Sequence, residues 1–345
     1  MLNKKVSFIA VLIFVLTVFL PVAFAKDDSV LDRDDSPKMR EIYEMYVLNE
    51  DNPAYAKNNE GNLYAIKGDI ESAKKMYQEA LKLDPVSTLI LNNLAWVLIV
   101  GGEYDEALTV LTQSMLIDGE NPSALFYTGV VHYLMDDMPE AKRNMTASII
   151  LDPTNPYVHY YLARVYEAQE DIENALLEAE AAAYILGDVW NPDVALFLGD
   201  VYGKAEMFQK AILQYQKLVD DPEYAFDAYY SLGVSYGRYD DFEKAEANFL
   251  KAMDLDKKNP AVHYGLGKLY STKDDLLNKS LSHAEEALKS DPEDPEYLYL
   301  VGWVYYRMQD MELAHEYISR ALEQDPGNEV YLYQKRVLEL DYLGK

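Results

Sequence analysis

The chain has 345 residues, half of them apolar, and a formal net charge of −28 from 59 acidic and 31 basic side chains. This apolar fraction excludes a disordered chain, and the length predicts several domains or a repeat array. The chain contains no Cys, which excludes disulfides, thiolate metal ligands and a catalytic or lipid-modified cysteine. The acidity disfavours binding to nucleic acids and to anionic lipid surfaces, because both depend on Lys and Arg.

Residues 1–25 have the pattern of a secretory signal peptide. Lys4 and Lys5 precede an apolar stretch over 6–20, and Ala23-Phe24-Ala25 provides an A-x-A cleavage site. We therefore predict cleavage after Ala25 and an exported protein, periplasmic or secreted, for which the absence of Cys is suitable. The alternative is an uncleaved anchor, since residues 6–25 are long enough to cross a bilayer. The chain would then meet the membrane only through this segment, with the rest outside the cytoplasm.

Residues 26–53 are expected to form an acidic leader and an N-terminal capping helix. Residues 26–35 are rich in Asp and are expected to be disordered, whereas 39–48 has the pattern of a helix that ends before Asn52-Pro53. This helix either caps the array that follows or is the second helix of a degenerate repeat.

Small residues recur in two series with a period of about 34 residues. The first series is Gly61, Ala95, Gly129, Ala163, Gly199, Gly233, Gly267 and Gly302, and the second is Ala73, Ala107, Ala141, Ala175, Ala211, Ala245, Ser280 and Ala314. Two independent series with one period indicate tandem repeats. The eight predicted repeats are 54–87, 88–121, 122–155, 156–189, 192–225, 226–259, 260–294 and 295–328.

Each repeat is predicted to hold two helices, separated from the next repeat by a break that contains Pro. In the sixth repeat the helices are expected over 226–237 and 242–255. The small residue of each first helix is expected to face the Ala of the second helix. Residues 329–345 are predicted to form a C-terminal capping helix, with Val330, Tyr333, Val337 and Leu340 toward the array and Gln334, Lys335, Arg336, Glu339 and Asp341 toward water.

The sixth repeat carries Leu232-Gly233, Tyr236, Ala245, Phe249 and Ala252. This pattern resembles the tetratricopeptide repeat. The resemblance covers residues 54–328 and implies an all-α, right-handed superhelical solenoid of tandem helix-turn-helix repeats. Departures include Leu98 and His132 at the Tyr position and extra residues before the fifth repeat and within the seventh. We interpret them as local changes in the pitch of the superhelix.

No chemical motif stands out in the chain. Metalloprotease, Walker, nucleophile-elbow and EF-hand patterns are missing from the sequence, and Gly265-Leu266-Gly267 follows no predicted strand. The five histidines, His132, His159, His263, His283 and His315, are interpreted as structural. We therefore predict no catalytic residue, no cofactor and no metal site, and a protein that is not an enzyme.

The resemblance implies that positions two, five, nine, twelve and thirteen of each repeat look into a concave groove. In the first three repeats none of these fifteen positions is charged, which favours an apolar or neutral partner segment; ordinary helix packing is the alternative explanation. Later repeats place Tyr, Trp and Arg there, which are types common in binding hot spots, and favour a polar or acidic segment. The candidate partner-binding residues are Tyr55, Asn58, Asn62, Asn92, Trp96, Phe126, Tyr133, Tyr157, Tyr160, Arg164, Lys204, Tyr230, Arg238, Tyr264, Lys268, Tyr299, Trp303, Tyr306 and Arg307.

Two binding modes of the family are not expected here. The clamp that holds a C-terminal carboxylate would fall on Asn58, Asn62, Asn93, Ser123 and Tyr127, and its three basic positions are missing. A ladder of Asn at position six survives only as Asn59 and Asn93.

The expected function is that of an exported scaffold or adaptor that binds protein or peptide partners in its groove. The assembly of a cell-envelope or secreted complex is the expected setting if the source is bacterial. A carbohydrate-binding protein is the main alternative, because Tyr and Trp also stack against sugars. A hydrolase or transferase with its site in the groove is a third hypothesis.

Overall fold

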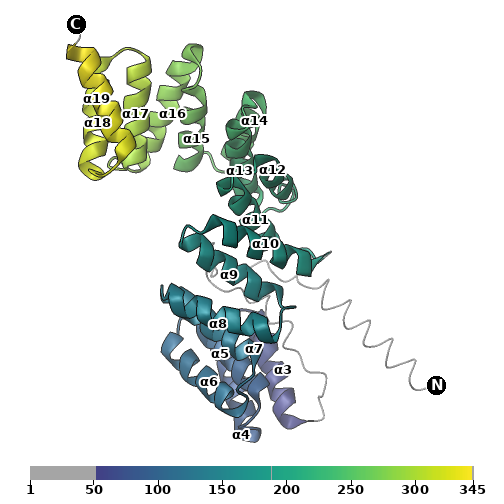
Figure 1. Ribbon diagram of the computed structural model, residues 1–345. Helices are drawn as coiled ribbons and strands as arrows, with labels where there is room; N and C mark the ends of the chain where they lie inside the picture. Colours follow the sequence, from purple (N-terminus) through teal and green to yellow (C-terminus); the bar gives the residue numbers. More distant parts are fainter. Residues whose placement is uncertain (1–51, 188, 344–345) are drawn as a thin grey trace. The chain divides into compact units, whose positions relative to one another are not determined.

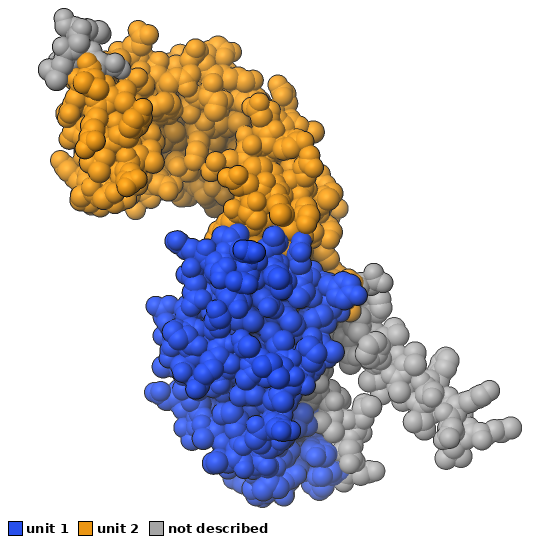
Figure 2. All heavy atoms as spheres, in the orientation of Figure 1, with its two compact units in different colours: residues 1–185 blue, residues 186–345 orange. Residues whose placement is uncertain are grey.

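A computed structural model describes residues 52–187 and 189–343 (Figure 1). The predicted signal peptide, the acidic leader and the capping helix at 39–48 lie outside the described residues. The described part is entirely helical and falls into two compact units, residues 1–185 and 186–345 (Figure 2). Each unit is a succession of antiparallel helix pairs, as the 34-residue period predicted.

The helices of the first unit form four pairs. They are α3 (Pro53–Ile66) with α4 (Ile70–Leu83), α5 (Thr88–Val100) with α6 (Tyr104–Ile117), α7 (Pro122–Leu134) with α8 (Met138–Leu151), and α9 (Pro156–Ala168) with α10 (Ile172–Leu186), whose last residue begins the second unit. From α3 to α9 each helix packs against the next one in the chain.

The second unit holds four further pairs and a final helix. They are α11 (Pro192–Lys204) with α12 (Phe208–Tyr215), α13 (Ala225–Arg238) with α14 (Phe242–Leu255), α15 (Pro260–Tyr270) with α16 (Leu277–Ser290), and α17 (Pro295–Arg307) with α18 (Met311–Gln324), followed by α19 (Glu329–Leu343). A short 3-10 helix, η2 (Asp274–Leu276), precedes α16. It accommodates the extra residue of the seventh repeat.

Asn and Asp side chains set where the helices begin. First helices commonly start at an Asn-Pro pair, as at Asn155, whose Oδ1 accepts a hydrogen bond from the backbone N–H of Tyr157 at 3.0 Å. Most second helices start at an Asp, as at Asp241, whose Oδ1 accepts from the N–H of Lys244 at 3.2 Å. These caps satisfy backbone donors that a helix leaves free at its first turn. The two cap types therefore mark the two helices of a repeat.

A residue in the left-handed backbone region precedes the second helix of most repeats. Gly68 and Gly102 take this conformation without a steric cost, whereas Asp136, Glu170, Glu206, Asp240 and Gln309 take it despite having a Cβ. The left-handed residue thus stands at the same place in the turn whatever its side chain, and the described part shows it in seven repeats. The seventh repeat, with η2 in this place, is the one that lacks it.

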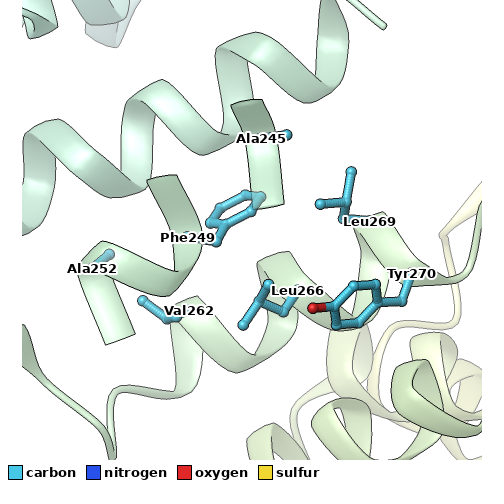
Figure 3. Packing of buried hydrophobic residues seen from close by; sticks show 7 residues of the cluster. All are labelled: Ala245, Phe249, Ala252, Val262, Leu266, Leu269 and Tyr270. Atoms are coloured by element: carbon cyan, nitrogen blue, oxygen red, sulfur yellow. The ribbon is translucent and has the colours of Figure 1, made fainter. Parts of the chain in front are cut away.

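The small residue of a first helix approaches the second series at Gly129 and Gly267, where an added Cβ would lie 3.2 Å and 3.4 Å from the carbonyl oxygens of Ala141 and Ser280, but it also makes room for a larger side chain. A Cβ at Gly61 would lie 2.6 Å from the Tyr77 ring, and one at Gly233 would lie 2.6 Å from the Phe249 ring. Each glycine therefore leaves room for a large side chain sixteen residues further on. Phe249 fills the space between α13 and α14 and packs with Val262 and Leu266 of the next repeat (Figure 3).

The buried face of α19 also differs from the prediction. Val330, Tyr333 and Leu340 are exposed, whereas Tyr331, Gln334 and Leu338 are buried. The Tyr331 ring stacks on that of Tyr299 at a centroid distance of 4.7 Å, and Leu338 packs against Ala314 and Ile318. The face that α19 buries is therefore shifted by one residue from the more apolar face that was predicted to be buried.

Candidate interaction surface

The structure separates the nineteen candidate residues into buried and accessible groups. Seven of them are at most 9% exposed, namely Asn58, Asn62, Asn92, Trp96, Phe126, Tyr133 and Tyr160. Nine are partly exposed, namely Tyr55, Tyr157, Arg164, Tyr230, Tyr264, Tyr299, Trp303, Tyr306 and Arg307. Lys204, Arg238 and Lys268 are exposed. All seven buried candidates belong to the first unit. Fewer of the candidate residues are therefore accessible there than the sequence predicted.

Buried amides join the helices of the first two repeats. The Nδ2 of Asn93 on α5 donates to the Oδ1 of Asn58 on α3 at 2.7 Å, and the Tyr77 hydroxyl on α4 donates to the Oδ1 of Asn62 at 2.6 Å. Burial raises the pKa of the Tyr77 hydroxyl, which therefore remains a donor. Asn58 and Asn62 thus act in packing between repeats, because their amide groups are engaged inside the protein.

A second amide group links α5, α6 and α7. Asn92 donates to the Oδ1 of Asn121 at 3.2 Å and accepts from the Ser114 hydroxyl at 2.8 Å. Asn121 in turn caps α7 by accepting from the Ala124 N–H at 3.0 Å. Asn92 is therefore a structural residue, and its link to a helix cap explains why an amide rather than an apolar side chain stands at this position.

Two buried polar atoms on α5 have no hydrogen-bond partner within the described part of the chain. They are the Oδ1 of Asn93 and the Nε1 of Trp96. Asn93 and Trp96 are one helical turn apart and are 1% and 0% exposed. An acceptor and a donor thus remain unpaired next to each other, which is unusual inside a protein.

Aromatic rings run through the interior of the first unit. Trp96 contacts Tyr127 at a centroid distance of 5.1 Å, and Phe126 contacts Tyr161 at 5.7 Å. Tyr133 lies 6.2 Å from the same Tyr161 ring. Because these rings are edge-on or tilted and largely buried, they stabilise the stacking of successive repeats.

Arg164 is held by aromatic neighbours on the first unit. Its Nη1 donates to the Tyr160 hydroxyl at 3.1 Å, and its guanidinium lies 5.6 Å and 5.9 Å from the ring centroids of Tyr160 and Tyr133. Burial, and then the charge of Glu167, raise the pKa of Tyr133 to about 12. Two tyrosines of the first unit thus fix the position of the Arg164 guanidinium.

Arg307 binds its own chain in the second unit. Its Nη1 donates to the Ser271 carbonyl at 2.7 Å, and its Nη2 contacts the Oδ1 of Asp274 at 2.6 Å. Both acceptors lie on the segment that includes η2, so Arg307 joins the eighth repeat to the turn of the seventh. Arg307 was expected to meet a partner, and the structure shows that it also makes these contacts within its own chain.

Two carboxylates of α11, in the second unit, also accept hydrogen bonds from tyrosines. Asp193 accepts a hydrogen bond from the Tyr224 hydroxyl at 2.6 Å, and Asp200 accepts one from the Tyr215 hydroxyl at 2.7 Å. Burial is the main cause that raises the pKa of Tyr215, with Asp200 contributing next. Tyrosine hydroxyls thus bind the carboxylates of neighbouring helices in this unit.

Aromatic side chains remain accessible on the first helices of the last three repeats. Tyr230, Tyr264 and Tyr299 occupy position five of three successive repeats, and all are partly exposed. Trp303 is partly exposed one turn beyond Tyr299 and lies 5.6 Å from the Tyr306 ring. Most of the accessible aromatic candidates thus lie on the second unit, and Tyr55 and Tyr157 are the partly exposed ones of the first unit.

Four histidines contact other side chains or backbone carbonyls. His132 lies 3.4 Å from Asp137, and His159 lies 2.6 Å from Glu178. His263 and His283 contact each other through their Nδ1 atoms at 3.0 Å. Over residues 52–187 and 189–343, no three His, Asp or Glu side chains gather closely enough to bind one metal ion. Among the helices of the described ranges, none has the length and apolarity needed to cross a bilayer.

These features define the class of the protein as an all-α helical repeat protein. Its aromatic surface lies on the first helix of each of the last three repeats. Residues 64–125, 226–259 and 277–329 match family models described as tetratricopeptide repeat. The helix pairs of these segments are therefore tetratricopeptide repeats, as the sequence pattern predicted. No curated protein matches the sequence.

Solved structures show the same fold at low sequence identity. The chain is similar to one in the crystal structure of the APC/C hetero-tetramer Cut9-Hcn1, with a TM-score of 0.58 and 16% identity. That match covers 87% of this chain and 58% of the other, so the chain spans little more than half the length of that relative. It is also similar to PilF of Pseudomonas aeruginosa, with a TM-score of 0.53, 20% identity and coverages of 62% and 96%. A third structure, YrrB, described as a TPR protein with an unusual peptide-binding site, has a TM-score of 0.47 and 20% identity, with coverages of 54% and 95%.

Proposed function

We propose that the protein is an exported scaffold that binds partner polypeptides on the aromatic surface of its second unit. The observation that carries this proposal is the recurrence of a partly exposed tyrosine at position five of three successive first helices, at Tyr230, Tyr264 and Tyr299. Tyr and Trp provide large contact areas at a small entropic cost and are frequent in binding hot spots. A surface that repeats along the array favours an extended polypeptide as ligand.

The partner is a protein rather than a nucleic acid, because a net charge of −28 repels a phosphate backbone. The accessible aromatic residues, together with a fold that generally serves in protein interaction, favour binding over catalysis. We assign no catalytic residue, no cofactor and no metal. The similar Cut9-Hcn1 structure is a hetero-tetramer, and an assembly of different chains is compatible with this role.

Export is supported by the first 25 residues. Lys4, Lys5, the apolar stretch and the A-x-A site together have the pattern of a cleaved signal peptide. N-terminal sequencing of the protein purified from its own cell tests this directly. A chain that begins at Lys26 supports export with cleavage, and an intact N-terminus in a membrane fraction supports the anchor. An intact N-terminus in the soluble cytoplasmic fraction would contradict both. We propose the assembly of a cell-envelope or secreted complex as the setting.

Site-specific photo-crosslinking tests the binding surface. A benzoylphenylalanine at Trp303 is compared with one at Leu213, which is exposed on the second helix α12. We expect a covalent adduct with a distinct polypeptide at position 303 that is missing at position 213. Equal labelling at both positions, or labelling at 213 alone, would move the interaction away from the first helices. The candidates Tyr160 and Arg164 are less suitable for this test, because they bind each other inside the first unit.

A further inference from the structure

A carboxylate stands among tyrosines at the aromatic surface of the second unit. Glu296 is exposed on the first turn of α17, which packs against α15, the helix that carries Tyr264. Tyr297, the next residue along α17, places its ring 5.5 Å from that of Tyr264. Tyr230 of α13 and Tyr331 of α19 are included because Glu296 contributes, after burial, to their raised pKa values. We call Tyr230, Tyr264, Glu296, Tyr297 and Tyr331 the Glu296 cluster.

The charge of Glu296 reaches rings on three other helices. Burial and then this carboxylate raise the pKa of Tyr331 to about 12. The same carboxylate also contributes, after burial, to the raised pKa values of Tyr264 and Tyr230. These hydroxyls therefore stay protonated, so the negative charge of the cluster resides on Glu296 and the rings remain neutral.

No cation of the described chain neutralises this carboxylate. Within residues 52–187 and 189–343, no Lys or Arg lies within ion-pair distance of Glu296. Arg307, at the other end of α17, is bound to Ser271 and Asp274. Lys268 is exposed, and its Nζ lies 5.6 Å from the centroid of the Tyr264 ring. A flexible cation thus already rests against one ring of the cluster without pairing to its charge.

The chemistry of the cluster fits a cationic side chain. The faces of tyrosine rings carry negative electrostatic potential and attract ammonium and guanidinium groups. A carboxylate beside them adds a charge-assisted hydrogen bond, which Arg can make with two N–H groups. The strongly acidic chain as a whole attracts basic partners and repels acidic ones. A basic segment differs from the acidic one that the sequence also allowed, because Arg307 is engaged within the chain.

We propose that the Glu296 cluster binds a Lys or Arg side chain of the partner polypeptide. This inference rests on the proposed scaffold function and specifies its ligand. A basic segment laid along the first helices would place one cation over the paired rings of Tyr264 and Tyr297 and beside Glu296.

The test uses a defined probe on the full mature chain. The probe is an acetylated and amidated octapeptide that alternates Gly and Arg, and its control contains citrulline, the uncharged isostere, in place of Arg. Binding is measured by calorimetry at physiological salt, where weak long-range attraction is screened. We expect the Arg peptide to bind and the citrulline peptide to bind at least about tenfold more weakly.

Two substitutions with the same change of charge separate a site from general attraction. Glu296→Gln removes the carboxylate of the cluster, whereas Glu316→Gln removes an exposed carboxylate on the second helix α18. We expect Glu296→Gln to weaken the Arg peptide about five- to tenfold and Glu316→Gln less than about twofold. Equal losses in the two variants, or equal binding of the citrulline peptide, would overturn the proposal.

Ring substitutions provide an independent measurement. Tyr264→Phe keeps the aromatic face and is expected to retain most of the affinity, whereas Tyr264→Leu is expected to lose about threefold or more. Unchanged affinity in Tyr264→Leu would contradict a role for the ring. If a natural partner forms an adduct at position 303 equally well when Glu296 is replaced, the scaffold function is supported and only the cation site is rejected.

Discussion

His159 and Glu178 join the two helices of the fourth repeat through a 2.6 Å contact between Nδ1 and Oε2. The other ring nitrogen of His159 lies 3.3 Å from the Pro153 carbonyl. With an acceptor on each side, the ring is stabilised as a doubly protonated imidazolium. His263 and His283 occupy the corresponding places of the seventh repeat, where the Nε2 of His263 likewise faces a carbonyl, that of Lys257, at 3.0 Å. The same contact between helices is thus built from a charge pair in one unit and from two histidines in the other.

Replacement of Glu178 by Gln is expected to destabilise the first unit at mildly acidic pH. The hydrogen bond to Glu178 is the main cause that raises the pKa of His159. A histidine with a raised pKa in the folded state contributes stability that is complete below its unfolded value of about 6.5 and is lost as pH rises through the folded value. We expect a loss of about 1–2 kcal/mol in the free energy of unfolding near pH 5.5 and a smaller loss near pH 9.

Denaturant unfolding at both pH values measures this effect, and hydrogen exchange in α9 and α10 locates it. Glu173→Gln, an exposed site on the same helix α10, is the control. A loss from Glu178→Gln that does not vary with pH would contradict the charge pair.

The His263–His283 pair is expected to act in the opposite direction. Burial, and then the charges of His263 and Lys279, lower the pKa of His283, while Glu286 acts weakly the other way. Because His263 donates from Nε2 to the Lys257 carbonyl, its Nδ1 accepts a hydrogen bond from the Nδ1–H of His283, and a second proton between the rings would break the contact. A histidine whose pKa is lowered in the folded state does not affect the free energy of unfolding above about pH 6.5. It reduces this free energy increasingly as the pH falls toward the pKa of the folded state.

We therefore expect His283→Gln to reduce the loss of stability of the second unit between about pH 7.5 and pH 5. NMR titration of the two imidazoles provides the measurement, and His315→Gln, an exposed histidine on α18, provides the control. An unchanged pH profile in His283→Gln would show that the two rings do not share a proton.

The repeat period allowed most of the fold to be predicted from the sequence. Helix bounds of the sixth repeat agree with the prediction to within a residue, since caps and breaks are local signals. The prediction of the face that α19 buries was wrong. Two apolar stripes overlap on that helix, and the choice between them depends on the Tyr299 ring of another repeat. Period alone could not reveal this contact between repeats.

The candidate surface was predictable by residue type but not by accessibility. Asn58 and Trp96 occupy groove positions of the repeat, yet contacts with neighbouring helices bury them. Arg307 was selected for its charge, and its contacts with Ser271 and Asp274 depend on the irregular turn of the seventh repeat. Glu296 is one of many acidic residues in the sequence, its tyrosine neighbours come from four helices, and no local pattern in the sequence indicates that they meet.

Gly233→Ala is expected to destabilise the second unit although Ala favours helices. The added Cβ would lie 2.6 Å from the Phe249 ring, which also fills the space beside Gly265. We expect a net loss of about 1–3 kcal/mol, because overpacking exceeds the gain of at most about 1 kcal/mol in helix propensity. Thermal and denaturant unfolding of the full chain measure this change.

Gly203→Ala is the matched control, since the nearest atom to its Cβ, the Tyr215 hydroxyl oxygen, lies 3.9 Å away. It is expected to leave stability unchanged or to raise it by up to about 1 kcal/mol. Combining Gly233→Ala with Phe249→Leu should cost less than the sum of the single changes. Additive costs would show that the glycine and the ring do not share this space.

Arg307→Lys is expected to loosen the turn of the seventh repeat without loss of charge. A lysine cannot reproduce the paired contacts of the guanidinium with the Ser271 carbonyl and the Asp274 carboxylate. Amide hydrogen exchange over residues 271–276 should quicken about threefold to tenfold, as expected for the loss of roughly 1 kcal/mol of local stability. Arg238→Lys, at an exposed site at the end of α13, should leave this exchange unchanged. If Arg307→Lys keeps the exchange rates of the wild type but weakens partner binding, Arg307 contacts the partner, and the sequence-based assignment of this residue was the better one.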